Sequence, residues 1–422
     1  MYHDSVMLTI AYHTLGCKVN QYETEKLRES LEIMGFSTVG FGSRADAYVI
    51  NTCSVTGVAD SKSRAAVRKA LRQNPDAFVV VSGCYAELEP DSIAAIEGVD
   101  LVVPNSEKDV IPERIAAHFA GSGELGKAAQ RSVRPRVRTR AVVKVQDGCD
   151  QFCSYCVIPY ARSGKTSRPI DDVHAELKTL AEFGYHEIVL AGIRLGSFTP
   201  GLPQLIREAI KIEGIERIRL SSIEPWEVND ALLDAMDSPK VCRHLHIPLQ
   251  SGDDGVLKSM NRPYTAAEYR DIIANVRGRI PGIGITTDVI VGFPGETGEA
   301  FVNTCAMIES VDFSRLHVFR YSPRERTRAA LMPDQVSAEV KRERAEKLIE
   351  LGNTAMRRFA SSLVGETVEV LVETSANRPD YLTGFADNYV SVSFKGDASL
   401  KGKIIKVEIT GTDQDGAIAV KR

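Results

Sequence analysis

Residues 141–164 have the sequence AVVKVQDGCDQFCSYCVIPYARSG, in which an apolar strand leads directly to Cys149, Cys153 and Cys156. The C-x3-C-x2-C spacing provides three thiolates for a 4Fe-4S cluster and leaves the fourth iron free to bind an exogenous ligand. A cluster that only carries electrons generally has protein ligands on all four irons, so this spacing indicates chemistry at an open iron. Zinc is the structural alternative, but it requires a fourth ligand, and no His or Cys stands nearby at a usual spacing.

The strand before these cysteines is the first of six strand-like stretches that alternate with helix-like stretches as far as about residue 330. The six are AVVKVQD, EIVLAGI, RIRLSSI, HLHIPLQ, GITTDVIVGFPG and RLHVFRYSP. Such alternation is typical of a parallel sheet with crossover helices. Six units predict a partial (βα)6 barrel, more open than the eight-unit barrel, which can admit a macromolecular substrate.

Three further cysteines each follow a strand-like stretch in residues 1–120. MLTIAYHTLGC ends at Cys17, DAYVINTC at Cys53 and FVVVSGC at Cys84, and each is followed by polar, helix-forming sequence. Ligands of open parallel sheets collect beyond the carboxyl ends of the strands, so these thiols can converge on one metal or cluster site. The alternative is three buried cysteines that pack as small apolar side chains.

The end of the chain changes to short alternating strands, which predict a small antiparallel β-barrel. At roughly 150 residues per domain, the 422 residues allow about three domains. We therefore expect an α/β protein in four parts. They are an N-terminal open parallel α/β domain (1–120), a basic linker (121–140), a central partial (βα)6 barrel with a C-terminal helix (141–362) and the β-barrel (363–422).

The expected linker contains five arginines and no acidic residue in its second half, RSVRPRVRTR. The arginines are Arg131, Arg134, Arg136, Arg138 and Arg140. Such a run is either a solvated tether or a set of phosphate contacts. The stretch SKSRAAVRKALRQ, residues 61–73, adds five basic residues at helical spacing, which can face the same polyanion.

Composition narrows the class of protein further. The formal charge is −4 and the pI is about 6.1, which argues against non-specific coating of nucleic acid but leaves room for local basic patches. The sequence contains no run of 18 or more apolar residues and no signal-peptide pattern, so we expect a cytoplasmic protein without a membrane partner.

These motifs together carry a resemblance to a known family. The C-x3-C-x2-C motif, with Tyr155 before its last cysteine and a βα series after it, resembles the radical S-adenosylmethionine (SAM) superfamily. The resemblance then narrows to the methylthiotransferase family and covers essentially the whole chain. The features that narrow it are the N-terminal cysteines, the segments HLHIPLQSGDDGVLKSMNRPYT and DVIVGFPGET, and a C-terminal domain similar to the TRAM domain. The opening TLGCKVNQYETE, residues 14–25, resembles the branch that acts on N6-threonylcarbamoyladenosine beside the tRNA anticodon.

The resemblance implies two 4Fe-4S clusters and SAM as cofactors. Carried over by position, Cys149, Cys153 and Cys156 bind the cluster whose open iron chelates SAM. Cys17, Cys53 and Cys84 bind an auxiliary cluster that carries the sulfur. Reductive cleavage of SAM then gives a deoxyadenosyl radical that removes hydrogen from C2 of the adenine, to which the methylated sulfur is joined.

The clusters carry this chemistry, so no catalytic side chains beyond their ligands are expected. The residues that we expect to contact SAM are Tyr155, Gln250, Ser251 and Gly292. Their alternative roles are ordinary, because Gln-Ser-Gly and Gly-Phe-Pro-Gly are also good turns.

The activity implied by the resemblance is methylthiolation at C2 of N6-threonylcarbamoyladenosine in tRNA. Methylthiolation of isopentenyladenosine in tRNA, or of an aspartate in a ribosomal protein, is the alternative within the family. A non-catalytic iron-sulfur protein that binds RNA is the alternative from another class. The expected partners of a monomeric enzyme are the tRNA anticodon stem-loop, an electron donor such as flavodoxin or ferredoxin, and a sulfur source.

The chain departs from the family pattern in two places. The family commonly has a Gly-Thr-Pro turn after RYSPR, whereas this chain has Glu325-Arg326-Thr327-Arg328. The TRAM-like residues 363–422 contain seven Lys and Arg against nine Asp and Glu. RNA contact in that domain must therefore depend on a patch, and the arginines between 131 and 140 are the alternative electrostatic contact.

Overall fold

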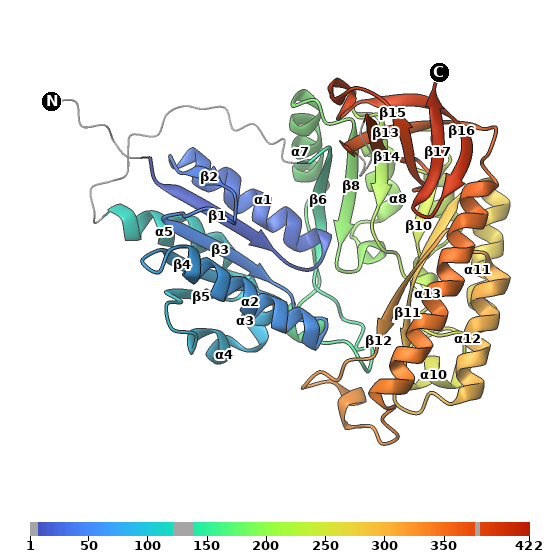
Figure 1. Ribbon diagram of the computed structural model, residues 1–422, viewed down its shortest axis with the longest axis horizontal. Helices are drawn as coiled ribbons and strands as arrows, with labels where there is room; N and C mark the ends of the chain where they lie inside the picture. The colour runs from blue at the N-terminus through green and yellow to red at the C-terminus, as the bar shows by residue number, and fades with distance from the viewer. Residues whose placement is uncertain (1–6, 121–137, 376–379) are drawn as a thin grey trace.

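The computed structural model describes residues 7–120, 138–375 and 380–422, and its parts are an N-terminal α/β domain, a central open barrel and a C-terminal closed barrel (Figure 1). The predicted fold class is confirmed. Within the described residues, no helix is both long enough and apolar enough to cross a membrane.

The N-terminal domain is a five-stranded sheet in the order β2-β1-β3-β4-β5, and every pair of neighbouring strands is parallel. The middle strand β3 is an unbroken buried run, AYVINT, because helices cover both faces of a parallel sheet. The elements are β1 (Thr9–Thr14), α1 (Lys18–Ile33), β2 (Ser37–Val39), β3 (Ala47–Thr52), α2 (Gly57–Gln73), β4 (Phe78–Gly83), α3 (Cys84–Leu88), α4 (Pro90–Ala94), β5 (Leu101–Val103), η1 (Asn105–Val110) and α5 (Ile111–Ala120).

The central domain contains the six predicted strands, all parallel where they pair with one another. Together with the two-residue β7, which pairs antiparallel with β6, they form two sheets, β7-β6-β8-β9 and β10-β11-β12, joined by a bridge between Ile218 and Val241. The strands are β6 (Arg140–Asp147), β7 (Thr166–Ser167), β8 (Glu187–Gly192), β9 (Arg217–Leu220), β10 (His244–His246), β11 (Gly284–Val291) and β12 (Arg315–Arg320). Since β12 does not pair with β6, the barrel stays open on one side.

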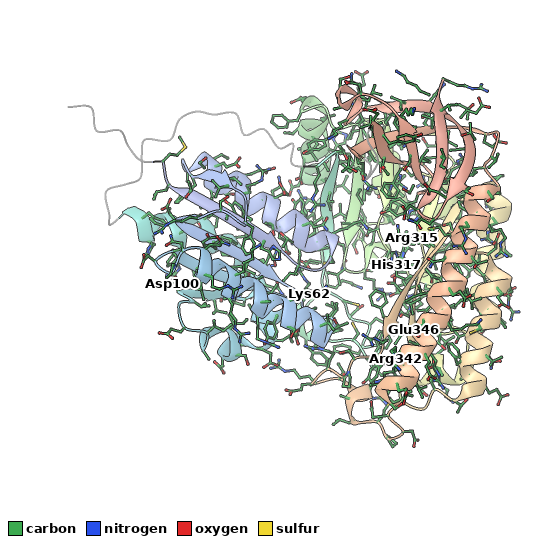
Figure 2. All side chains as sticks on the ribbon, viewed as in Figure 1. Lys62, Asp100, Arg315, His317, Arg342 and Glu346 are labelled. Atoms are coloured by element: carbon green, nitrogen blue, oxygen red, sulfur yellow. The ribbon has the colours of Figure 1, made fainter. Side chains whose placement is uncertain are left out.

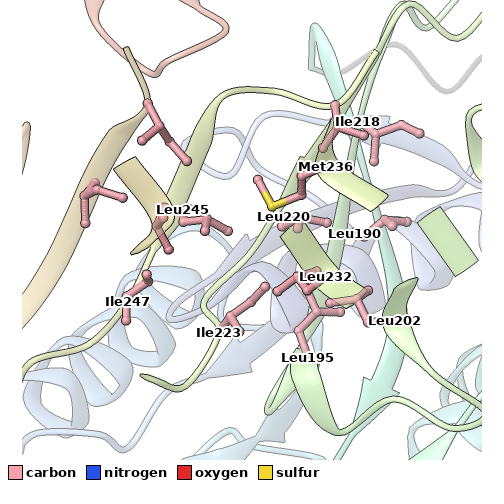
Figure 3. Packing of buried hydrophobic residues seen from close by; sticks show 14 of the residues in the cluster. Leu190, Leu195, Leu202, Ile218, Leu220, Ile223, Leu232, Met236, Leu245 and Ile247 are labelled. Carbon is pink, nitrogen blue, oxygen red and sulfur yellow. The ribbon is translucent and has the colours of Figure 1, made fainter. Parts of the chain in front are cut away.

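Helices cover the outside of this open barrel, and α13 packs along β12 (Figure 1). The helices are α6 (Ile158–Ala161), α7 (Ile170–Glu182), η2 (Leu195–Ser197), α8 (Leu202–Ala209), η3 (Pro225–Glu227), α9 (Asp230–Met236), α10 (Asp254–Ser259), α11 (Ala266–Arg279), α12 (Gly298–Val311), η4 (Arg328–Leu331) and α13 (Ala338–Ser361). Strand residues such as Leu220 and Leu245 pack with helix residues such as Leu232 and Met236 in one buried cluster (Figure 3). Each such side chain contributes about 1.5–3 kcal/mol by leaving water.

The C-terminal domain is a closed five-stranded barrel in the order β13-β14-β15-β17-β16. The strands are β13 (Thr367–Ser375), β14 (Tyr381–Ala386), β15 (Ser391–Lys395), β16 (Ile404–Asp413) and β17 (Gly416–Lys421), with η5 (Ala398–Leu400) between β15 and β16. The alternating stretches that predict strands here are ETVEVLVE, NYVSVSF, KGKIIKVEITG and AIAVKR, so the prediction misses β14. The barrel is also not wholly antiparallel, because β15 and β17 close it as a parallel pair.

Two buried arginines of β9 join this barrel to the central domain. Arg219 donates hydrogen bonds to the main-chain carbonyls of Ala386 and Asp387, at 3.1 and 3.0 Å. Arg217 donates to the carbonyl of Glu369 at 2.7 Å. These contacts hold β13 and the turn between β14 and β15 against β9 of the central domain.

Candidate active site between two sets of cysteines

Three strands of the N-terminal sheet bring the first set of cysteines to one edge. Cys17 precedes α1 as its N-terminal cap, Cys53 follows β3, and Cys84 is the first residue of α3 directly after β4. Because these strands are parallel, their carboxyl ends lie at the same edge of the sheet. All three cysteines line one cavity of about 970 Å³, so the structure brings this predicted set together.

Cys149, Cys153 and Cys156 line the same cavity from the opposite side. They lie on the loop after β6, where the amide of Cys156 donates to the carbonyl of Cys153 at 3.0 Å and closes a turn. Cys153 is buried, and Cys149 and Cys156 are half-buried. The six predicted ligands therefore face one space between the N-terminal domain and the open barrel.

Burial, together with the smaller effect of the neighbouring cysteines, raises the pKa of Cys53 to about 11 and that of Cys156 to about 12. Iron binds the deprotonated thiolate, so the positive charge of the iron must offset the free energy needed to remove the thiol protons. Within the described residues, no three His, Cys, Asp or Glu side chains are arranged around a single metal ion. The ligands of a four-iron cluster bind separate irons, and two sets of three thiols on loops beside a cavity suit that chemistry.

A buried group of charged residues, which we call the junction network, lies between the two sets of cysteines. Its centre is the ion pair of Glu23 and Arg162, with Oε1 to Nη1 at 2.8 Å and Oε2 to Nη2 at 2.8 Å. Arg162 also pairs with Asp147 at 2.9 Å and donates to the side-chain oxygen of Asn20 at 2.7 Å. Lys108 and Lys144 both contact Glu23.

The junction network connects the two sets of cysteines through their own loops. Glu23 and Asn20 lie on the first turns of α1 after Cys17, and Asn20 accepts a 3.8 Å hydrogen bond from the Cys17 thiol. Arg162 follows Cys156 at the end of α6. Burial alone would raise the pKa of Glu23, but the hydrogen bonds of Arg162 and the charge of Lys108 outweigh it and hold this pKa far below its usual range.

The four expected SAM contacts divide into two pairs. Tyr155 and Gln250 line the cavity. Ser251 is fully buried and its hydroxyl lies 3.3 Å from that of Thr304, while Gly292 packs so closely on Lys341 of α13 that a Cβ would lie 2.2 Å from a side-chain carbon. The structure therefore does not bring Ser251 and Gly292 to the cavity.

The sequence analysis missed polar residues that line the cavity beside the second set. Ser221, Glu224 and Arg262 face it from the barrel interior, and Arg262 donates to the Cys153 sulfur at 3.4 Å. Arg262 also pairs with Glu224 and lies 4.8 Å from the ring centroid of Trp226. A signal was present for Arg262, since it belongs to the quoted segment HLHIPLQSGDDGVLKSMNRPYT.

The two described arginines of the basic run differ in their surroundings. Arg138 is exposed and lines the cavity mouth. Arg140 is paired with Glu373 at 2.7 Å and lies 5.1 Å from the ring centroid of Phe385, so the C-terminal barrel holds it. Arg131, Arg134 and Arg136 lie outside the described residues. Figure 2 labels three further basic side chains near the side of the barrel where β12 and β6 do not pair: Lys62 of α2 and Arg315 and His317 of β12.

Three family models match separate parts of the chain. Residues 9–104 match the model of the uncharacterized protein family UPF0004, residues 143–308 that of the radical SAM superfamily, and residues 361–414 that of the TRAM domain. A radical SAM methyltransferase from Kitasatospora setae, TsrM, has a similar fold, with a TM-score of 0.58 over 77% of each chain at 16% identity.

Two curated relatives cover nearly the whole chain. The threonylcarbamoyladenosine tRNA methylthiotransferase MtaB of Bacillus subtilis is 41% identical over 96% of this chain and 94% of its own. The tRNA-2-methylthio-N(6)-dimethylallyladenosine synthase of Acetivibrio thermocellus is 36% identical over 94% of this chain and 87% of its own. The chain belongs to the radical SAM methylthiotransferase family. As a radical SAM protein it takes SAM and a 4Fe-4S cluster as cofactors.

Proposed function

We propose that this chain is a tRNA methylthiotransferase that adds a methylthio group at C2 of N6-threonylcarbamoyladenosine. The observation that carries the proposal is the convergence of two separate sets of three cysteines on one cavity. A protein that only bound RNA would have no use for two thiol sets facing a shared space. The name and the 41% identity of the Bacillus subtilis relative support the choice of nucleoside.

The radical SAM cluster binds at Cys149, Cys153 and Cys156 in this proposal, and an auxiliary cluster binds at Cys17, Cys53 and Cys84. When bound, the two clusters supply the electron that cleaves SAM and the sulfur that is transferred. The protein side chains orient SAM and exclude water. Tyr155, Gln250 and Glu224 are suited to orienting SAM, because they line the cavity close to the second set of cysteines.

The tRNA anticodon stem-loop enters, in this proposal, through the open side of the barrel. Arg138 is exposed and lines the cavity. Arg131, Arg134 and Arg136 precede it in the sequence and add positive charge to the same run. The guanidinium of Arg140 is paired with Glu373 of the C-terminal barrel, so in this proposal Arg140 has a structural role beside the cavity. An electron donor and a sulfur source complete the partners of a monomeric, cytoplasmic enzyme.

Relatives named for dimethylallyladenosine favour a second candidate nucleoside, isopentenyladenosine. Mass spectrometry of tRNA nucleosides separates the two. A deletion strain should lose 2-methylthio-N6-threonylcarbamoyladenosine, accumulate the unmodified nucleoside, and recover the product when the intact gene is returned. Loss of only the isopentenyladenosine product would assign the second nucleoside, and unchanged tRNA nucleosides would refute both assignments.

A further inference from the structure

The segment Ser322–Ala329 follows the end of β12 and bonds to residues that neighbour Cys53 and Cys153 and to the helix that begins at Cys84. In Figure 1 it lies in orange at the bottom of the view, between the N-terminal domain and α13. It contains the four residues that depart from the family pattern, Glu325 to Arg328. We call this segment the bracket.

The first contact of the bracket is with the loop that carries Cys53. Arg324 donates to the hydroxyl of Ser54 at 2.7 Å and pairs with Asp60 at 2.6 Å. Ser54 is fully buried and itself donates to Asp60 at 2.7 Å, so three side chains close a ring directly after Cys53. The amide of Gly57 adds a hydrogen bond to Ser322 at 3.1 Å.

The second contact is with the helix that begins at Cys84. Arg326 donates to the carbonyl of Leu88, the last residue of α3, at 3.0 Å. Arg326 also has a φ of +70°, a left-handed conformation that favours glycine. Glycine takes such a conformation without strain, so glycine at this position would keep the turn but lose the contact of Arg326 with the N-terminal domain.

The third contact is with the loop of the second set of cysteines. The amide of Ala329 donates to the carbonyl of Ser154 at 2.8 Å, between Cys153 and Cys156. Thr327 fixes the bracket internally, because its hydroxyl donates to the carbonyl of Arg324 at 2.7 Å. One short segment thus bonds next to Cys53, at the end of the Cys84 helix and inside the second cysteine loop.

We propose that the bracket sets the position of the first set of cysteines relative to the second, and that Arg324 is its principal positioning residue. The proposal rests on the proposed function, in which both sets act on one adenosine. Transfer between two sites depends steeply on their relative position, because a displacement of about 1 Å can cost a hundredfold in rate. SAM cleavage depends only on the second set and should be insensitive to the bracket.

Two measurements on the reconstituted protein test this proposal with three variants. Arg324→Ala removes the contact with Ser54 and Asp60, and Arg326→Gly removes the contact with Leu88 while suiting the left-handed backbone. Arg328→Ala is the matched control, an exposed arginine of the same segment. Hydrogen exchange should become about tenfold faster at residues 54–60 in the first variant and at residues 84–88 in the second, and stay unchanged in the control.

The second measurement is the ratio of methylthio product to deoxyadenosine. We expect this ratio to fall about tenfold or more in Arg324→Ala, with the rate of SAM cleavage unchanged. Unchanged exchange in Arg324→Ala would overturn the bracket, and faster exchange with an unchanged ratio would overturn its positioning role. If the unaltered protein makes no methylthio product, the proposed function fails, and the exchange result alone decides whether the bracket exists.

Discussion

The two sets of cysteines reach the same cavity by different structural routes. Cys149, Cys153 and Cys156 belong to one loop, so a single turn after β6 arranges them. Cys17, Cys53 and Cys84 are separated by about 30 residues or more and follow three different strands. The second set depends on local sequence, whereas the first exists only when the whole N-terminal sheet has formed. Their chemistry should therefore be separable by mutation, and their sensitivity to folding should differ.

The largest effect should come from removing the second set. Replacing Cys149, Cys153 and Cys156 with Ala should abolish SAM cleavage and reduce the iron content from about eight to about four atoms per chain. The fold should survive, because the local loop contributes little to the core. Anaerobic reconstitution followed by iron analysis and deoxyadenosine measurement checks this. A full iron content in this variant would contradict the assignment of the ligands.

The first set gives the complementary expectation. Replacing Cys17, Cys53 and Cys84 with Ala should also leave about four irons per chain, keep reductive cleavage of SAM, and abolish the methylthio product. Chromatography of deoxyadenosine and nucleoside mass spectrometry measure the two activities in one sample. Loss of SAM cleavage while the second cluster is still present would show that the two sets do not divide the chemistry.

Mutation of the junction network, which joins the N-terminal domain to the barrel, should lower the stability of the protein strongly. Glu23→Gln leaves Arg162, Lys108 and Lys144 without their shared carboxylate and should lower the free energy of unfolding by about 3–5 kcal/mol. Urea titration followed by circular dichroism measures this. The matched control is Glu29→Gln, because Glu29 lies on the same helix in a partly exposed pair with Lys26 and should cost less than about 1 kcal/mol.

The same carboxylate sets an expected pH dependence. The pKa of Glu23 is lowered on folding, so its contribution is fully present above its unfolded pKa near 4.5 and is lost as the pH falls below that value. The unaltered protein should therefore lose more stability between pH 5 and pH 3 than Glu23→Gln does. Equal losses in both proteins would contradict a buried, ionised Glu23.

The smallest effect is expected for the run of five arginines that ends at Arg138 and Arg140. Changing Arg131, Arg134, Arg136, Arg138 and Arg140 to Gln should weaken tRNA binding and lower the slope of log affinity against log salt by about 0.7–0.9 per lost phosphate contact. SAM cleavage without tRNA should be unaffected. The single change Arg140→Gln should alter the slope least, because Glu373 already pairs with it. An unchanged slope in the fivefold variant would make the run a solvated tether.

Sequence patterns predicted the structure best where a feature depends on the residues of a single strand or helix. The strand periodicity predicted all six barrel strands, and the positions of Cys17, Cys53 and Cys84 after parallel strands predicted one shared edge. The short β14 was missed because its alternation is interrupted by Gly384, which lies against the main chain of β13. Strand pairing across a barrel, such as the parallel pair β15 and β17, depends on closure and has no signature within either strand.

The site residues that the sequence analysis missed were missed for the same reason. Glu23 and Arg162 are 139 residues apart, and each looks like an ordinary charged residue within its own helix or loop. Ser251 follows Gln250, which lines the cavity, but its hydroxyl lies against Thr304 of α12, and Gly292 packs against Lys341 of α13. Arg262 is buried against Trp226 and Glu224, which come from another part of the chain. Proximity of this kind becomes visible only after folding.

The two domain junctions differ in how freely their halves could be exchanged between relatives. At the C-terminal junction, the buried Arg217 and Arg219 donate to main-chain carbonyls, which every sequence of the same barrel provides, while the side-chain pairs Arg140–Glu373 and Arg243–Asp387 are partly exposed. At the N-terminal junction, Glu23 needs Arg162 and Lys144 from the partner domain, so both sides must be inherited together. A chimera that takes a foreign TRAM domain should therefore assemble, while one that takes a foreign N-terminal domain should do so only if it brings a carboxylate to this position.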